Sequence, residues 1–196
     1  KLAPIHVAIV PIYKGEEQLA AISEKVNAIK TQLEAKGIIV KFDDDDQKKP
    51  GWKFAEYEMK GVPVRIALGQ RDMDAGTAEV ARRDTLEKKT YQQEELVDVI
   101  PQLLEDIQSN LYNKANQFRA DNISEVESYD EFKSVLEEKG GFILAHWDGT
   151  PETEDLIKKE TKATIRCIPF GYDKSEGKCM VTGNSSSQKV IFAKAY

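Results

Sequence analysis

Short apolar runs alternate with amphipathic stretches over the first hundred residues, and this alternation restricts the chain to folds in which helices pack on a sheet. Residues 5–12 are almost continuously apolar, which is typical of a strand buried on both faces. An amphipathic helix follows, because apolar side chains recur at spacings of three and four: Leu19, Ile22, Val26, Ile29 and Leu33. Gly37 then stands where a helix commonly ends.

Three further strands are predicted at residues 38–42, 64–68 and 77–83, with a short helix at residues 52–60 between the first two. The resulting order is strand, helix, strand, helix, strand, strand. It predicts an α/β fold in which helices cover a mixed β-sheet.

A long helix with one apolar face is predicted next, from Leu96, Val99, Ile100, Leu103, Leu104, Ile107 and Leu111. Pro101 lies inside this pattern, so we expect it to kink or interrupt the helix. The polar stretch that follows indicates a junction between two domains, residues 1–105 and residues 106–196, connected by this helix.

The second predicted domain is a smaller α+β unit. Ser128 and Thr150 stand at the N-caps of two expected helices. Strands are predicted at residues 142–147 and 163–168. Two more segments, residues 179–181 and 190–193, are expected to pair as the arms of a hairpin.

Charge is unevenly distributed along the chain, whose net charge is −6. Residues 48–89 carry ten basic and seven acidic side chains, whereas residues 120–196 carry ten basic and fourteen acidic ones. A basic middle focuses a polyanion on that region. The chain opens at Lys1, with no Met and close to a predicted strand, so we expect a piece of a longer protein.

Several classes of protein are excluded by what the sequence lacks. It has no P-loop and no GxGxxG, and no apolar run approaches the ~20 residues of a membrane span. The histidines, His6 and His146, have no metal-site or nucleophile spacing, and aspartates 43–46 predict a solvated turn rather than a metal site. Two cysteines suit a reducing, cytoplasmic setting.

Aromatic, acidic and basic side chains are concentrated in residues 49–72, beside Gly and Pro breaks. This mixture suits single-stranded RNA, because aromatic and arginine side chains stack on unstacked bases. A carboxylate can accept hydrogen bonds from guanine N1–H and its amino group, while Arg or Lys can donate to O6 and N7. The alternative is that Trp52, Phe54 and Tyr57 are core residues and the charges face water.

These residues resemble the anticodon-binding domain of the prolyl-tRNA synthetases. The likeness rests on residues 50–60, on Gly61-Val62-Pro63 with Arg65 and Arg71-Asp72, and on Arg82-Arg83-Asp84. It extends from residues 2–5 through residues 163–170 and 177–179 to residues 192–196, and so covers the chain. The branch it resembles is the archaeal and eukaryotic-like type, which carries a C-terminal extension.

The resemblance implies that this chain recognises the anticodon guanines of tRNA(Pro), and that its parent enzyme is a proline–tRNA ligase, a homodimer using ATP and Mg. No class II synthetase ATP motif is present, so this fragment is expected to be inactive alone. The other implied partner is the catalytic domain of the same chain, with neither DNA nor membrane. Candidate anticodon contacts are Lys53, Glu56, Glu58, Arg71 and Arg82.

In this family the extension often binds zinc through four cysteines. The matching positions here are Asp148, Thr153, Cys179 and Thr182. Because threonine is a poor zinc ligand, we expect the metal to be lost. The resemblance also implies that Tyr196 serves as a docking element at the chain terminus.

Two alternatives remain at this point. The acidic second domain is compatible with a protein-interaction module that does not bind RNA. A small thiol enzyme using Cys167 or Cys179 is disfavoured, because neither has a CxxC partner or a histidine placed by sequence to activate it.

Overall fold

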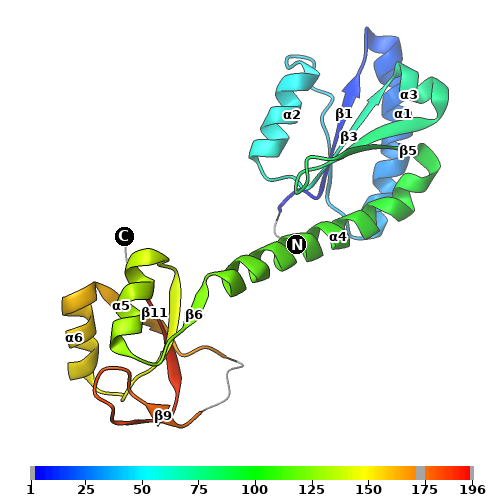
Figure 1. Ribbon diagram of the computed structural model, residues 1–196. Coiled ribbons are helices and arrows are strands. Elements are labelled where there is room, and N and C mark those ends of the chain that lie inside the picture. Colours follow the sequence, from blue (N-terminus) through cyan, green and yellow to red (C-terminus); the bar gives the residue numbers. More distant parts are fainter. Residues whose placement is uncertain (1–2, 171–174, 195–196) are drawn as a thin grey trace. The chain divides into compact units, whose positions relative to one another are not determined.

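A mixed five-stranded sheet with strand order β2-β1-β3-β4-β5 organises the first part of the chain (Figure 1). Its strands are β1 (Val7–Ile12), β2 (Val40–Phe42), β3 (Val64–Gly69), β4 (Thr77–Arg82) and β5 (Lys88–Gln92). Strand β1 runs parallel to β2 and β3, while β4 is antiparallel to β3 and β5. The predicted mixed sheet is confirmed. This computed structural model describes residues 3–170 and 175–194, so Tyr196 lies outside the described residues.

Helices cover the two faces of this sheet unequally. The helices are α1 (Glu16–Ala35), α2 (Pro50–Met59), α3 (Gln70–Ala75) and α4 (Leu96–Asp121), with a 3-10 turn at Gln93–Glu95 before α4. Apolar residues of α1 and α4 form one core with Val64, Ile66 and Leu68 of β3. On the other face, Tyr57 of α2 packs on Ala8 and Val10 of β1. That face therefore has its helix over β1, at one side of the sheet.

Pro101 does not interrupt α4, which runs for 26 residues. A proline has no N–H to donate to the carbonyl four residues earlier, which here belongs to Val97. The Lys36 ammonium donates to that carbonyl oxygen instead, at 2.9 Å. The predicted interruption is wrong because a side chain from the end of α1 takes the place of the missing helical bond.

The chain divides into two units, Lys1–Asn113 and Lys114–Tyr196, so the division lies within α4. The second unit has a four-stranded sheet of order β6-β7-β11-β8. Its elements are β6 (Ile123–Glu125), α5 (Tyr129–Glu138), β7 (Phe142–His146), α6 (Pro151–Thr161), β8 (Ala163–Cys167) and β11 (Lys189–Lys194). Ser128 and Thr150 cap α5 and α6 as predicted. Phe132 of α5 meets Phe192 of β11 edge to face in the core, with ring centroids 5.4 Å apart.

The predicted hairpin of residues 179–181 and 190–193 is wrong. Strand β11 pairs instead with β7 and β8, and the small hairpin is formed by β9 (Gly177–Lys178) and β10 (Ser185–Ser186). The apolar residues Met180 and Val181 join the core without strand geometry. Among the described residues, no helix is both long and apolar enough to cross a bilayer.

Candidate nucleic-acid interface

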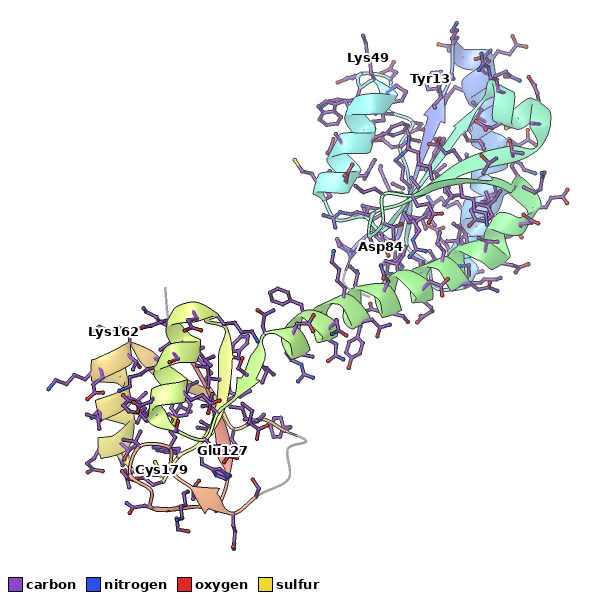
Figure 2. All side chains as sticks on the ribbon, viewed as in Figure 1. Tyr13, Lys49, Asp84, Glu127, Lys162 and Cys179 are labelled. Carbon is purple, nitrogen blue, oxygen red and sulfur yellow. The ribbon has the colours of Figure 1, made fainter. Side chains whose placement is uncertain are left out.

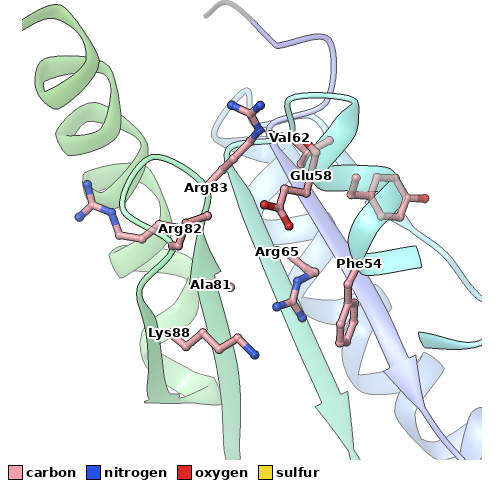
Figure 3. Close-up of a pocket in the computed structure, with 10 residues that line it drawn as sticks. Phe54, Glu58, Val62, Arg65, Ala81, Arg82, Arg83 and Lys88 are labelled. Atoms are coloured by element: carbon pink, nitrogen blue, oxygen red, sulfur yellow. Dashed lines mark hydrogen bonds between the residues drawn. The ribbon is translucent and has the colours of Figure 1, made fainter. Parts of the chain in front are cut away.

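A cavity of about 250 Å3 opens beside α2, over the part of the sheet that α2 leaves uncovered (Figure 3). It is lined by residues of α2, β3, β4 and β5 and of the connecting turns: Phe54, Tyr57, Glu58, Val62, Arg65, Ala81, Arg82, Arg83, Leu86 and Lys88. Figure 3 shows Phe54, Glu58, Arg65 and Lys88 around the same hollow. The cavity therefore brings together the Phe54 ring, the Glu58 carboxylate and the cationic groups of Arg65 and Lys88.

Strand register brings these side chains together. Arg65 pairs with Ala81 across β3 and β4, and Ala81 pairs with Lys88 across β4 and β5. Directly paired residues share one face of a sheet, so Arg65 and Lys88 lie on the same side with only a methyl group between them. The small side chain of Ala81 provides the floor of the hollow.

The Arg65 guanidinium lies against the Phe54 ring, 3.6 Å from its centroid. The Arg65 side chain is 13% exposed, and its Nη2 lies 3.8 Å from Glu79 Oε1. Within the described part of the chain its buried Nη1 has no hydrogen-bond partner. A buried donor of this kind costs free energy unless something satisfies it. Burial also lowers the pKa of Arg65 from its ordinary value.

Of the five residues predicted to contact an anticodon, Glu58 and Arg82 line this cavity. Glu58 is exposed, and its carboxylate points into the hollow in Figure 3. Its backbone carbonyl accepts a hydrogen bond from Arg83 Nε at 2.7 Å, which ties the end of α2 to the β4–β5 turn.

Arg82 contributes to the wall, but its guanidinium extends to the other side of the strand (Figure 3). It forms two hydrogen bonds with Asp84, at 2.9 and 2.7 Å. Asn110 of α4 donates to the same carboxylate at 2.7 Å. The Arg82 bonds lower the pKa of Asp84 below its ordinary value of 3.8. Arg82 thus joins β4 to α4 through Asp84, whose position is labelled in Figure 2.

Lys53 and Glu56 lie elsewhere on α2. The Lys53 side chain is 2% exposed, and its ammonium is enclosed by the turn after β2. Glu56 forms an ion pair with Lys60, one helical turn later. Of the three aromatic residues in this stretch, Tyr57 is buried in the core, Phe54 lines the cavity, and Trp52 is exposed beneath the Lys48 ammonium.

Arg71 is exposed on α3, outside the lining of the cavity. Helix α3 begins where Asp72 Oδ2 accepts a hydrogen bond from the Gly69 N–H at 2.8 Å. It ends at Gly76, whose φ of 67° requires the left-handed conformation that glycine adopts readily. The short helix holds Arg71 just beyond the carboxyl end of β3.

Sequence reasoning did not select Arg65, Lys88 or Phe54 as site residues. Arg65 and Phe54 belong to the segment that resembles the family. Only their stacking contact, which the structure shows, distinguishes them from the other residues of that segment. Lys88 belongs to β5, a strand that was not predicted. The available signal was the alternation on β3, where Arg65 interrupts the apolar residues Val64 and Ile66.

In the second unit, three of the four positions matched to zinc ligands form a hydrogen-bonded cluster. Thr153 and Thr182 donate to Asp148 Oδ2 at 3.0 and 2.8 Å, and Thr150 donates to Oδ1 at 2.9 Å. Cys179, labelled in Figure 2, is buried. One thiol, one carboxylate and two hydroxyls do not suit zinc. In residues 3–170 and 175–194, no three His, Cys, Asp or Glu side chains are placed so that they could hold a metal ion together.

Two protein-family models match the chain. The model described as "Anticodon binding domain" matches residues 6–103, and "Prolyl-tRNA synthetase, C-terminal" matches residues 129–196. The proline–tRNA ligases of Christiangramia forsetii and Parabacteroides distasonis are 57% and 60% identical over 195 residues. They cover this whole chain, which spans only 40% and 39% of their length.

A solved structure matches as well. The prolyl-tRNA synthetase from Cryptosporidium parvum, complexed with L-proline and AMP, shares 33% sequence identity with a TM-score of 0.85. The match covers 98% of this chain and 41% of that chain. The sheet, its α2-side hollow and the matched model define the first unit as an anticodon-binding domain. The chain belongs to the prolyl-tRNA synthetase family, of which it carries the anticodon-binding and C-terminal parts.

Proposed function

We propose that the first unit binds the anticodon loop of tRNA(Pro), and that the hollow beside Arg65 receives one unstacked guanine. The observation that carries this proposal is the Arg65 guanidinium, stacked on Phe54 with a buried and unpartnered Nη1. The Arg65 side chain is 13% exposed, so the exposed part of its guanidinium can donate to an acceptor on a base that enters the hollow. The aromatic and guanidinium surfaces also offer the stacking that single-stranded RNA uses.

The charges around the hollow favour guanine over adenine. The N1–H and amino group of guanine donate to a carboxylate such as Glu58, while O6 and N7 accept from Arg65 or Lys88. Adenine presents an amino donor where guanine presents O6, so it places a donor against the cations. Each correct pairing of this kind is worth about 1–3 kcal/mol of discrimination.

The remaining candidate residues have different proposed roles. Arg71, exposed on α3, contacts a phosphate of the loop. Lys53, Glu56 and Arg82, whose charged groups are engaged within the protein, support the surface rather than contact a base.

For the whole protein we propose that the parent enzyme activates proline with ATP and Mg and charges tRNA(Pro) in the cytoplasm as a homodimer. The chain of residues 1–196 carries no bond-making centre in this proposal and binds no zinc. It is therefore expected to give no proline-dependent ATP–pyrophosphate exchange, and measurable exchange by the purified chain contradicts that part.

The test uses a fluorescent anticodon stem–loop RNA with guanine at the two positions read, and the same RNA with adenine there. We expect the chain to bind the guanine loop about tenfold more tightly by anisotropy. Glu58→Gln removes most of this preference, because it replaces an acceptor-only group with an amide. Glu24→Gln, an equal charge change at an exposed position of α1, keeps it. Equal affinity of the unmodified chain for the two loops contradicts the proposal.

A further inference from the structure

The ammonium group of Lys53 is a deeply buried charge in the first unit, comparable in exposure to the Asp84 carboxylate. The Lys53 side chain is 2% exposed. Its Nζ lies 2.8 Å from the Asp43 carbonyl oxygen, 2.6 Å from the Asp45 carbonyl oxygen and 3.1 Å from Asp43 Oδ1. An ammonium has three hydrogen atoms to donate. All of them are used within the turn that follows β2, and a phosphate or base has no access to them.

Asp43 connects this ammonium to the rest of α2 and to the sheet. Tyr57 Oη donates to Asp43 Oδ2 at 3.0 Å, and the Asp43 N–H donates to the Ile9 carbonyl of β1 at 3.0 Å. Lys53 and Tyr57 are four residues apart and therefore share one face of α2. The Asp43 carboxylate, 15% exposed, therefore contacts both Lys53 and Tyr57, and we call these three residues the Asp43 clamp.

The two clamp residues on α2 each immediately precede a residue that lines the hollow. Phe54 follows Lys53 and Glu58 follows Tyr57, so both are turned by about 100° from the clamp face toward β3. A rotation of α2 about its axis therefore moves the Phe54 ring off Arg65 and the Glu58 carboxylate away from the hollow together. At its carboxyl end α2 has separate attachments, since Val62 N–H donates to the Tyr57 carbonyl at 3.0 Å and Arg83 holds Glu58.

We propose that Lys53 is a positioning residue for guanine recognition: it fixes the rotation of α2 through the Asp43 clamp and makes no contact with RNA. The inference rests on the proposed function, because it concerns the same hollow. A buried cation that does not contact RNA thus affects the preference of the site for guanine.

The test separates positioning from contact by salt dependence. A lysine that contacts a phosphate of a single strand contributes about 0.7 to the slope of log K against log salt. Lys53→Met removes the charge and keeps the length of the side chain. We expect the guanine-to-adenine affinity ratio to fall at least about fivefold while the salt slope stays unchanged, measured well below the unfolding temperature. Lys49→Met, at the exposed N-cap of the same helix, leaves the ratio unchanged.

A merely structural role lowers the folded fraction and weakens both RNAs equally, so the affinity ratio is the decisive readout. An unchanged ratio in Lys53→Met, or a salt slope reduced by one phosphate contact, overturns the inference. If Lys53→Met does not fold, Tyr57→Phe provides the test, because it removes only the hydroxyl that bonds Asp43. Its ratio must then fall with the slope unchanged. Lack of guanine preference in the unmodified chain instead overturns the proposed function, and this inference with it.

Discussion

The Lys36 ammonium donates a hydrogen bond to the Val97 carbonyl, at 2.9 Å, and so completes the backbone bonding of α4 at the point where a proline follows. Lys36 also lies 2.8 Å from Asp98 Oδ1, but that pair is largely exposed and contributes little. A side chain at the end of α1 therefore replaces a main-chain donor of α4 and adds a polar contact between the two helices.

Lys36→Met is expected to lower the free energy of unfolding by about 1 kcal/mol, because the Val97 carbonyl loses its donor. In a Pro101→Ala background, residue 101 regains an N–H, and the loss from Lys36→Met should shrink by about half or more. Urea denaturation of the four proteins of this cycle measures the difference. Lys41→Met, at an exposed position of β2, serves as the control. Additive effects of the two substitutions contradict the prediction.

The Arg82–Asp84 pair predicts a stability that declines in acid. The pKa of Asp84 is lowered in the folded protein, so the pair stabilises the fold fully above the ordinary value of 3.8 and loses its effect as pH falls below it. Asp84→Asn should therefore cost about 2 kcal/mol at pH 7. The difference between the two proteins should narrow below about pH 4 in urea titrations. A difference independent of pH argues against the pair.

Strand β5 shows which part of the fold could not be predicted from the sequence. Strands β1 and β3 were predicted within a residue or two, because β1 is continuously apolar and β3 is apolar apart from Arg65. Strand β5 was missed, since Lys88, Lys89 and Thr90 are all exposed and its pairing depends on β4 alone. Without β5, Lys88 could not be placed beside Arg65.

Lys53 shows the second limit. A lysine among aromatic residues suggested an RNA contact, because lysine is almost never fully buried unless it is paired. Its burial depends on two carbonyl groups and a carboxylate from a turn ten residues earlier, and no local pattern reveals how that turn curls. The family resemblance correctly identified the first unit as an anticodon-binding domain. Which of its cations face outward depends on side-chain geometry.

The Asp148 cluster predicts indifference to metal. Chelation with EDTA should leave the unfolding temperature of the chain unchanged, and metal analysis should find no stoichiometric zinc. Asp148→Ala should cost about 2 kcal/mol, because Thr153 and Thr182 lose their shared acceptor. Near-stoichiometric zinc in the purified protein contradicts the prediction.

The same cluster permits a constructive experiment. Combining Asp148→Cys, Thr153→Cys and Thr182→Cys with the existing Cys179 provides four thiols, two of them with the C-x2-C spacing of zinc sites. We expect the triple variant to bind one zinc and to become sensitive to EDTA. Asp148→Cys alone, which places two thiols at these four positions, is the control and should bind no zinc tightly. A triple variant that folds but binds no zinc shows that these positions do not converge.

Arg71→Ala should weaken every anticodon loop to a similar degree, because a phosphate contact carries no base information. The salt slope of log K should fall by about 0.7, while the guanine-to-adenine ratio remains unchanged. Lys30→Ala on α1 is the matched loss of charge and should change neither quantity. A collapse of the ratio in Arg71→Ala instead assigns Arg71 to a base.

Strand β5 is the last strand of its sheet and has a backbone pairing partner on only one side. Exposed strand borders of this kind recruit strands from other molecules, and lysine side chains along them discourage such self-association. Lys88 and Lys89 are both exposed there. Lys88, which lines the proposed RNA site, and its neighbour Lys89 are therefore also expected to limit self-association. A variant without both lysines is expected to bind RNA more weakly and to aggregate more readily.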